Sequence, residues 1–241
     1  MLKSLKPKES GSSIKYIAHF GGSFNPVHSG HLLIANILID KYGFDEVIFV
    51  PNGDNYPKPG LAKENNRLAL LEKAISGKPG LTISQYELNQ DKLVNTIQTV
   101  THLTQSLKQK YDQLKLFCIR GADAVWHFRN WRSLPQLCEL ATVLVIPRKG
   151  MELNDLFEDN SKLKSLSENF RIVDEVFPEI SSTSIRSELM LSQNVETAKD
   201  YFPSEVLIEI EKRGMYGIPI PGNDWIPIAR PGISGKAKKL R

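Results

Sequence analysis

Residues 21–31 hold side chains and glycines that suit the binding of phosphate groups. His28 and His31 are three residues apart at the start of a predicted helix, so their imidazoles point the same way. A helix N-terminus carries partial positive charge and free N–H groups, and it therefore favours an anion. Gly21 and Gly22 let the backbone approach a bulky ligand, because no Cβ stands in the way. The segment predicts a phosphate cradle rather than a zinc site, since no Glu or Cys at ligand spacing accompanies the histidines.

A second group of polar residues precedes a predicted helix late in the chain, at Ser181, Ser182 and Thr183. One hydroxyl before a helix is explained as an N-cap, but three in succession are not. Arg186 stands in the first turn, where Asp or Glu is usual, and no carboxylate occupies the position that a capping box would use. An anionic ligand explains both features, so we predict a second phosphate-binding segment here.

Both segments resemble signatures of one enzyme family. Residues 22–31, Gly-Ser-Phe-Asn-Pro-Val-His-Ser-Gly-His, resemble the HxGH signature of the adenylyltransferase branch of the nucleotidyltransferases. The doubled glycine before Ser23 looks most like the nicotinate-mononucleotide enzymes of that branch. Residues 180–186 resemble the ISSTxIR signature of the same family. A dinucleotide-dependent oxidoreductase would instead carry a Gly-x-Gly-x-x-Gly fingerprint after its first strand, and Phe24, Pro26 and His28 occupy that turn here.

The resemblance runs over residues 14–217 and implies a set of site residues. Catalysis is carried over to His28, His31 and Arg186. The predicted ATP-binding residues follow strands or precede a helix, and they are Gly21, Gly22, Ser23, Phe24, Gly121, Asp123, Ile146, Arg148, Ser181, Ser182 and Thr183. The predicted acceptor-binding residues are Lys58, Thr96 and Trp131.

Three of these assignments carry a specific role in the family. Asp123 is expected at the ribose hydroxyls, Ile146 and Arg148 beside the adenine, and Trp131 stacked on the pyridine ring. From the residues alone, Asp123 can equally be an N-cap and Trp131 a core aromatic. No metal-binding side chains are predicted.

Two segments depart from the family's pattern. Its Pro-Pro-His-Lys type of run after the second strand reads Asn55-Tyr56-Pro57-Lys58 here, so that the lysine is kept and the histidine is not. Its Ser-Tyr-Thr segment before the third helix reads Val94-Asn95-Thr96, so that only the threonine matches. Both segments surround the mononucleotide in the family. We therefore predict intact handling of ATP and leave the identity of the acceptor open.

The elements that must position these residues alternate between strand and helix. Runs of β-branched and aromatic residues predict strands at 14–20, 47–50, 81–84, 116–119, 142–146 and 171–175. Apolar residues at helical period predict helices at 31–42, 64–75, 96–109, 122–140 with an interruption at Pro135, 182–191 and 203–213. The alternation predicts parallel βαβ units, and hence an α/β fold with a Rossmann-like doubly wound sheet. Such sheets bind ligands beyond the carboxyl ends of their strands.

Composition divides the chain into three predicted parts. Residues 1–13, rich in Lys, Ser and Gly, predict a disordered lead, and residues 14–217 the nucleotidyltransferase catalytic domain. Residues 218–241 predict a Pro-rich and basic C-terminal tail, which carries Trp225. Inside the domain, residues 151–166 are polar and poorly periodic, which predicts a loose insert.

The distribution of charge, the apolar runs and the cysteines indicate which partners and which compartment to expect. The net charge is +4, and much of the excess lies at residues 1–8 and 235–241 rather than on one element, so we predict no nucleic-acid partner. No apolar run approaches the roughly 20 residues of a membrane span. Cys118 and Cys138 lie in apolar surroundings, which predicts buried thiols in a reducing compartment and a cytoplasmic protein.

The reaction that the resemblance implies joins two nucleotides. It is adenylyl transfer from ATP to nicotinate mononucleotide, giving deamido-NAD and pyrophosphate in NAD biosynthesis, with Mg²⁺ bound to ATP as the cofactor. The acceptor phosphate is already an anion at neutral pH, so no nucleophilic triad is required, and none is found. Nicotinamide mononucleotide or another phosphorylated acceptor stays open, as does a non-catalytic nucleotide-binding regulator.

Overall fold

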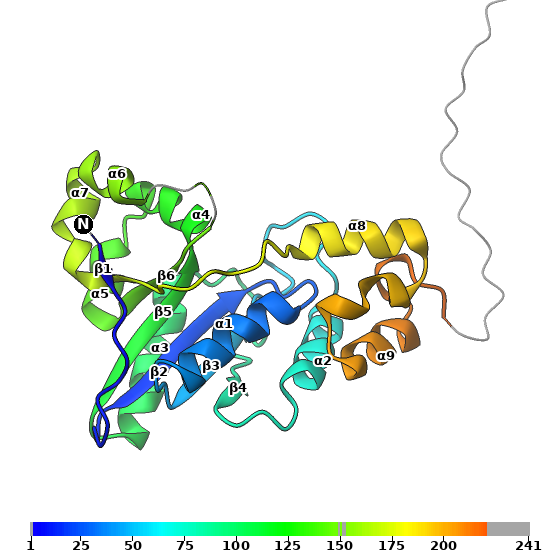
Figure 1. The fold of residues 1–241 in the computed structure, drawn as a ribbon, viewed down its shortest axis with the longest axis horizontal. Helices are drawn as coiled ribbons and strands as arrows, with labels where there is room; N and C mark the ends of the chain where they lie inside the picture. Colours follow the sequence, from blue (N-terminus) through cyan, green and yellow to red (C-terminus); the bar gives the residue numbers. More distant parts are fainter. Residues whose placement is uncertain (1, 149, 151–152, 221–241) are drawn as a thin grey trace, which may run out of the picture.

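The computed structural model describes residues 2–148, 150 and 153–220. Within this part of the chain, the strands form one seven-stranded sheet in the order β1-β7-β6-β5-β2-β3-β4 (Figure 1). Every neighbouring pair is parallel, as predicted. The strands are β1 (Lys3–Ser4), β2 (Lys15–Gly22), β3 (Glu46–Pro51), β4 (Leu81–Ile83), β5 (Leu114–Gly121), β6 (Thr142–Ile146) and β7 (Phe170–Ile172).

The long helices lie where the apolar period places them. They are α1 (Ser29–Asp40), α2 (Glu64–Ile75), α3 (Thr96–Lys110), α8 (Ser182–Ser192) and α9 (Ser204–Lys212). Shorter helical segments are α4 (Ala122–Val125), η1 (Trp126–Asn130), α5 (Leu134–Leu140), α6 (Leu153–Glu158), α7 (Ser161–Ser165), η2 (Ser167–Asn169), η3 (Val195–Tyr201) and η4 (Met215–Gly217). The α/β doubly wound fold is therefore confirmed.

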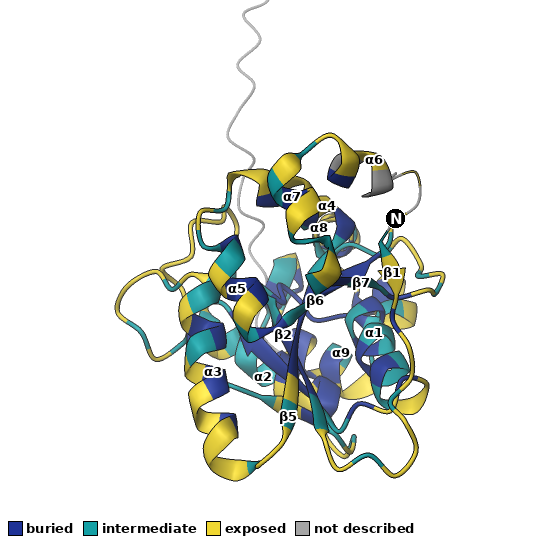
Figure 2. Cartoon of the chain, turned by 90° about the vertical axis from the view of Figure 1, so that its left-hand side faces the viewer, coloured by how far each residue is buried: buried dark blue, intermediate teal, exposed yellow. Residues whose placement is uncertain are grey.

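Alternation along the strands separates two hydrophobic cores on opposite faces of the sheet. On one face, Ala18 and Phe20 of β2 pack with α1, α2, α8 and α9. On the other face, Ile17 of β2 and Cys118 of β5 pack with α3, α4, α5 and α7. Figure 2 shows the buried strands between helices whose outer surfaces are exposed. Both faces of the central strands are thus covered, as a parallel sheet requires.

The strand order reverses at β2, the first long strand. The chain leaves β2 through α1 to reach β3 on one side, and later returns to place β5 on the other side. The crossover elements diverge at this point and leave a crevice beyond the carboxyl ends of β2 and β5. Residues 21–31 and 121–123 follow those two ends, so the fold brings the predicted turns to one crevice.

Three expectations about local structure are wrong. The described part of the lead is not disordered, because β1 pairs with β7 and Leu5 is buried against the core. Residues 151–166 are not a loose insert in their described part, because α6 and α7 bury Phe157 and Leu163. The break in the helix predicted over 122–140 falls at residues 131–133, before Pro135, which lies in the first turn of α5 where its missing N–H costs nothing.

Two smaller differences concern strand and tail limits. The strand predicted over 171–175 ends at residue 172, since the neighbouring strand β6 offers partners only from Val143 to Val145. The predicted tail begins with Ile218, which is buried, and continues from residue 221 onward outside the described residues, as does Trp225.

Candidate active site

A cavity of about 800 Å³ opens at the carboxyl ends of β2 and β5. It is lined by backbone and side chains from the turn after β2, the loop after β3, the start of α3 and the segment after β5. Nine predicted site residues line it: Gly21, Gly22, Ser23, Lys58, Thr96, Gly121, Asp123, Trp131 and Arg148. The predicted ATP and acceptor residues therefore share one space. The remaining predicted residues, from the two phosphate signatures and Ile146, lie outside its lining.

The two histidines form a stacked pair at the start of α1. His28 is the N-cap residue, and its ring centroid lies 3.7 Å from that of His31. The backbone N–H of His28 donates to Nδ1 of His31 across 3.2 Å, which fixes the second ring over the helix end. His31 also packs edge-on against Phe20, which lines the cavity, and against Phe24. The pair thus adjoins the cavity through Phe20.

Burial keeps both imidazoles neutral at neutral pH. Desolvation, and then the charge of Arg148, lower the pKa of His28 to about 4. Desolvation also holds the pKa of His31 well below its usual range, and His28, Arg148 and Lys58 add to this. Cationic groups therefore act on the pair, while no carboxylate does. An anion bound here would relieve that repulsion.

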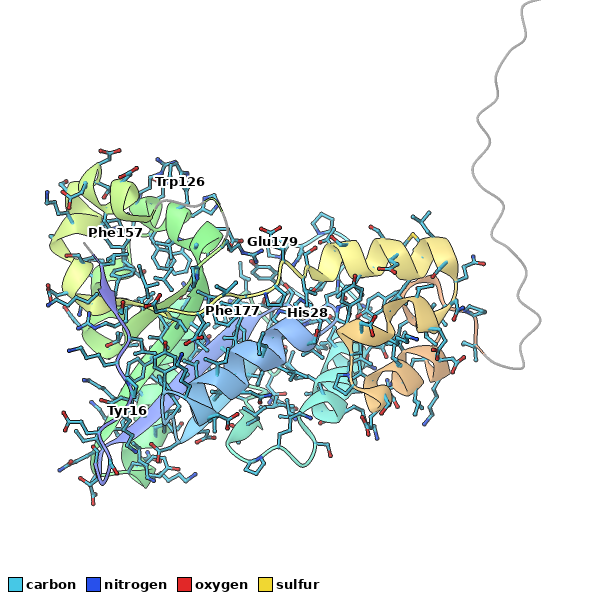
Figure 3. The ribbon with its side chains drawn as sticks, in the orientation of Figure 1. Tyr16, His28, Trp126, Phe157, Phe177 and Glu179 are labelled. Carbon is cyan, nitrogen blue, oxygen red and sulfur yellow. The ribbon has the colours of Figure 1, made fainter. Side chains whose placement is uncertain are left out.

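The second phosphate signature meets the first directly. Ser181 is the N-cap of α8, and its Oγ accepts from the backbone N–H of Ser184 at 3.1 Å. Ser182 Oγ donates to the backbone oxygen of Pro26 at 2.9 Å. Arg186 Nη1 donates to the backbone oxygen of Asn25 at 2.7 Å. Figure 3 shows the segment with Phe177 and Glu179 passing His28 on its way into α8. The two helix starts therefore converge.

No acidic residue stands in the first turn of α1 or of α8. The loop after β3 brings Lys58 to the same place, where its Nζ donates to Ser23 Oγ at 3.2 Å. Burial, and then the charges of Arg186 and Arg67, lower the pKa of Lys58. Cations thus gather at two helix starts whose first turns carry no carboxylate, an arrangement that attracts a polyphosphate.

Arg67 is a structural residue of the site that the sequence reasoning missed. Its side chain is fully buried, and it donates to three backbone oxygens in the loops around the cavity. These belong to Ser23 at 2.9 Å, Asn52 at 2.6 Å and Ala62 at 2.7 Å. The signal was present, because an arginine lies on the buried face of a predicted amphipathic helix.

The side chain of Asn25 also connects separate segments around the turn after β2. Its Nδ2 donates to the oxygen of Gly60 at 2.8 Å, and its Oδ1 accepts from the backbone N–H of Ala62 at 3.2 Å. The hydroxyl of Tyr216 donates to the same Oδ1 at 3.1 Å. The turn after β2 is therefore held from the loop after β3 and from the C-terminal end of the described chain.

The end of β5 carries the predicted ribose site. Asp123 lies in the first turn of α4, and its Oδ1 accepts from Arg148 Nε at 3.1 Å in an exposed ion pair. A Cβ at Gly121 would lie 2.4 Å from that oxygen, so glycine is needed for this carboxylate position. Ile146, predicted near adenine, is buried at the end of β6 with 6% of its surface exposed.

The acceptor side holds polar residues that the sequence reasoning also missed. Glu87 is buried with 6% of its surface exposed, and it accepts from Asn52 Nδ2 at 2.8 Å and Thr99 Oγ1 at 2.6 Å. Arg120 Nη2 donates to Oγ1 of the predicted Thr96 at 2.6 Å. Trp131 packs on Phe128 with ring centroids 4.5 Å apart, yet it also lines the cavity, so it takes part in the core and the site together.

Among the described residues, no group of three or more imidazole, thiol or carboxylate side chains gathers as a metal site. Among the same residues, no helix combines the length and the apolar character that a bilayer span would need.

Comparisons with known proteins agree on one relationship. Residues 19–188 match the model of the cytidylyltransferase-like family. A probable nicotinate-nucleotide adenylyltransferase of Clostridium perfringens is 31% identical over 84% of this chain and 98% of its own length. One from Dehalococcoides mccartyi is 29% identical over 81% and 94%. Plasmodium falciparum nicotinic acid mononucleotide adenylyltransferase, solved with NaAD, matches the fold with a TM-score of 0.66 at 16% identity, over 86% of this chain and 99% of that one.

Proposed function

We propose, because this chain belongs to the cytidylyltransferase-like family and to its nicotinate-nucleotide adenylyltransferases, that it transfers the adenylyl group of ATP to nicotinate mononucleotide. The products are deamido-NAD and pyrophosphate, and the reaction is a step of NAD biosynthesis. One observation of the molecule carries the proposal. Arg186 of α8 donates a hydrogen bond to the backbone oxygen of Asn25 in the turn before α1, and this contact between the two phosphate signatures supports their binding to a single nucleotide.

The reaction needs little acid or base chemistry. A phosphate oxygen of the mononucleotide attacks the α-phosphorus of ATP in line, and the bond from that phosphorus to the bridging oxygen of the β-phosphate breaks. The nucleophile is an anion at neutral pH, since its second pKa is about 6. Catalysis therefore rests on holding two anions together and on neutralising charge on the transferred group and the leaving pyrophosphate.

The site supplies those groups in a fixed arrangement. His28 and His31 hold the ATP phosphates, and one of them stabilises the α-phosphate in the transition state. Ser182, Thr183 and Arg186 bind the β- and γ-phosphates at the start of α8. Their support is the convergence of both helix starts and the absence of carboxylates in the first turns. Gly21, Gly22, Ser23 and Ser181 complete the phosphate turns.

The two ends of the cavity divide the remaining ligand groups. Asp123 and Gly121 bind the ribose of ATP, with Ile146 and Arg148 beside the adenine. Lys58, Thr96 and Trp131 bind the acceptor, with the indole stacked on the pyridine ring. This division is supported by the positions of Asp123 in the first turn of α4, after β5, and of Thr96 at the start of α3. Phe24, buried against His31, acts by positioning that ring.

A divalent cation, Mg²⁺, accompanies ATP in this proposal. The ion would be held mostly by ATP and water, and it would supply positive charge against the phosphates. The donor set fits that role, because the described residues build no cluster of carboxylates that would hold the ion by themselves. We also propose a cytoplasmic location, which suits the unpaired thiols of Cys118 and Cys138.

Pyrophosphate release tests the function. The purified protein is incubated with ATP, Mg²⁺ and either nicotinate or nicotinamide mononucleotide, and the dinucleotide is identified by mass. We expect deamido-NAD and pyrophosphate in equal amounts. Faster turnover of nicotinamide mononucleotide would reassign the acceptor. Binding of ATP without pyrophosphate release, for either acceptor, would make the protein a nucleotide-binding regulator.

A further inference from the structure

Arg120 places a cation in the wall of the cavity without a carboxylate partner. It is the penultimate residue of β5, is half-buried and lines the cavity. Its Nη2 donates to Thr96 Oγ1 at 2.6 Å, which holds the guanidinium at the start of α3. Among the described residues, no Asp or Glu oxygen lies within ion-pair distance of it. A partly desolvated cation of this kind is normally paired.

Two buried nitrogen atoms at the same place also have no partner. They are Nε of Arg120 and Nε2 of His19, and neither has a hydrogen-bonding partner among the described residues. His19 is 1% exposed, lines the cavity, and stands opposite Cys118 in the pairing of β2 with β5. Its Nδ1 lies 3.3 Å from Cys118 Sγ. Buried polar atoms are rarely left without a hydrogen bond, so these two nitrogens are available to bond a polar group of a ligand.

A flat ring in the cavity would bring a substituent to this corner. Trp131 lines the cavity, and the guanidinium carbon of Arg120 lies over its ring, 5.6 Å from the indole centroid. A pyridine ring that packs against this pair would bring its substituent to the guanidinium. The planar guanidinium matches a planar carboxylate, which it binds through two parallel hydrogen bonds.

We infer that Arg120 is a specificity-determining residue, which binds the carboxylate on the pyridine ring of the acceptor and so favours nicotinate over nicotinamide mononucleotide. The inference rests on the proposed function. Arg120 joins the groups that distinguish one acceptor from another, and it lies outside both sequence signatures. An amide in place of the carboxylate would present an NH₂ group and no charge, leaving the guanidinium without a counter-ion.

The phosphate of the acceptor is the other anion that Arg120 could meet. The proposed phosphate-binding groups, however, lie around the start of α1, where the charge of Lys58 acts on His31 and that of Arg186 acts on Lys58. Arg120 instead contacts Thr96 and Trp131, two residues assigned to the acceptor, of which Trp131 is assigned to its ring. The position therefore favours the carboxylate.

His19 supports this corner as a neutral group. Burial and the nearby charge of Arg120 lower the pKa of His19 to about 3, so the ring adds no second cation. A Cβ at Gly21 would lie 2.8 Å from the His19 ring, so glycine leaves room for the imidazole beside the turn. The imidazole therefore adds no charge beside the guanidinium of Arg120.

Selectivity between two acceptors tests the inference. Wild type, Arg120→Met and the control Arg129→Met, an exposed arginine on η1 outside the cavity, are assayed with both mononucleotides. For Arg120→Met we expect kcat/KM to fall roughly 100-fold with nicotinate mononucleotide and to stay within about threefold with nicotinamide mononucleotide. The control should leave both values near wild type.

The other outcomes distinguish a failure of the Arg120 inference from a failure of the proposed function. Equal losses with both acceptors in a folded variant would overturn the inference and point to phosphate binding or a structural role. Unchanged selectivity would overturn it as well. An inactive wild type would refute the proposed function instead. Should Arg120→Met fail to fold, Thr96→Val removes the hydroxyl that orients the guanidinium and should lower the nicotinate preference roughly tenfold; an unchanged preference would count against the inference.

Discussion

Arg186 on α8 donates a 2.7 Å hydrogen bond to the backbone oxygen of Asn25, the residue three positions before His28. Two segments that lie more than 150 positions apart in the chain are thereby joined at the mouth of the site. Both present helix N-termini and neither carries an acidic side chain in its first turn. Under the proposed function, the two sequence signatures form one anion-binding region.

His31 is expected to act in the chemical step. His31→Ala should lower kcat by roughly 100-fold or more, by analogy with the loss of one donor to a developing oxyanion. His127→Ala, which changes an exposed histidine on η1, serves as the control. Steady-state pyrophosphate release measures both variants. Turnover close to wild type in His31→Ala would remove this residue from catalysis.

Arg186 is expected to contribute mainly to ATP binding. Arg186→Met removes a cation for the β- and γ-phosphates, and kcat/KM for ATP should fall roughly 100-fold. Arg186→Lys keeps the charge and loses the second donor, so it should recover part of the loss. Titration of ATP against each folded variant measures the binding component. An unchanged dissociation constant for ATP in Arg186→Met would assign the residue to loop structure alone.

Stability should fall in mild acid because buried histidines are neutral in the fold. The folded pKa of His19 is about 3 and that of His28 about 4, both below the unfolded value near 6.5. The unfolded chain therefore binds more protons between pH 6.5 and 4, and stability is lost as pH falls through that window. Each histidine adds a slope of about 1.4 kcal/mol per pH unit.

Urea unfolding at pH 7, 6 and 5 checks this dependence. His19→Leu should reduce the slope between pH 6 and 5 by about 1.4 kcal/mol per pH unit, whatever it does to stability at pH 7. Histidine His102, which is exposed and stacks on Tyr86, provides the control substitution His102→Leu. A slope that does not change in His19→Leu would contradict the low pKa of the buried imidazole.

Arg67 should matter for stability more than any surface cation. Arg67→Met leaves three part-buried backbone oxygens without their donor, and the free energy of unfolding should drop by roughly 3 kcal/mol or more. Arg67 also lies 3.5 Å from the carboxylate of Asp54. Lys63→Met is the matched control, since Lys63 lies 3.7 Å from the same carboxylate but its side chain is 80% exposed, and it should cost less than about 1 kcal/mol. Equal decreases in the free energy of unfolding of the two variants would contradict the larger stabilising role of Arg67.

The sequence predicted the framework of the molecule well where the periodic pattern was long. The helix at Glu64–Ile75 begins and ends as predicted, because its apolar period is closed by Gly77. The sequence-based prediction failed where contacts between residues far apart in the chain determine the local structure. Lys3–Ser4 has no strand signal of its own and is ordered by the edge of β7. Likewise, α6 and α7 are short and form around the buried Phe157 and Leu163.

The same distinction applies to the site. The two signatures predict phosphate-binding residues, and the fold brings the two segments together. Arg67, Glu87 and Arg120 carry no local motif, and each is recognised only by its position on a buried face or at the cavity. The sequence signal for such groups is a charged residue at an inward-facing position of an apolar strand or helix. This signal does not identify the residues that the charged side chain contacts.

Tyr216 donates to Asn25 Oδ1, so a residue near the end of the described chain touches the turn that follows its first long strand. During synthesis on the ribosome, that turn is made about 190 positions before the tyrosine that supports it. Nascent chains that stop before this tyrosine would lack that hydrogen bond to the turn. Competence to bind ATP should therefore arise only after Tyr216 has left the ribosome.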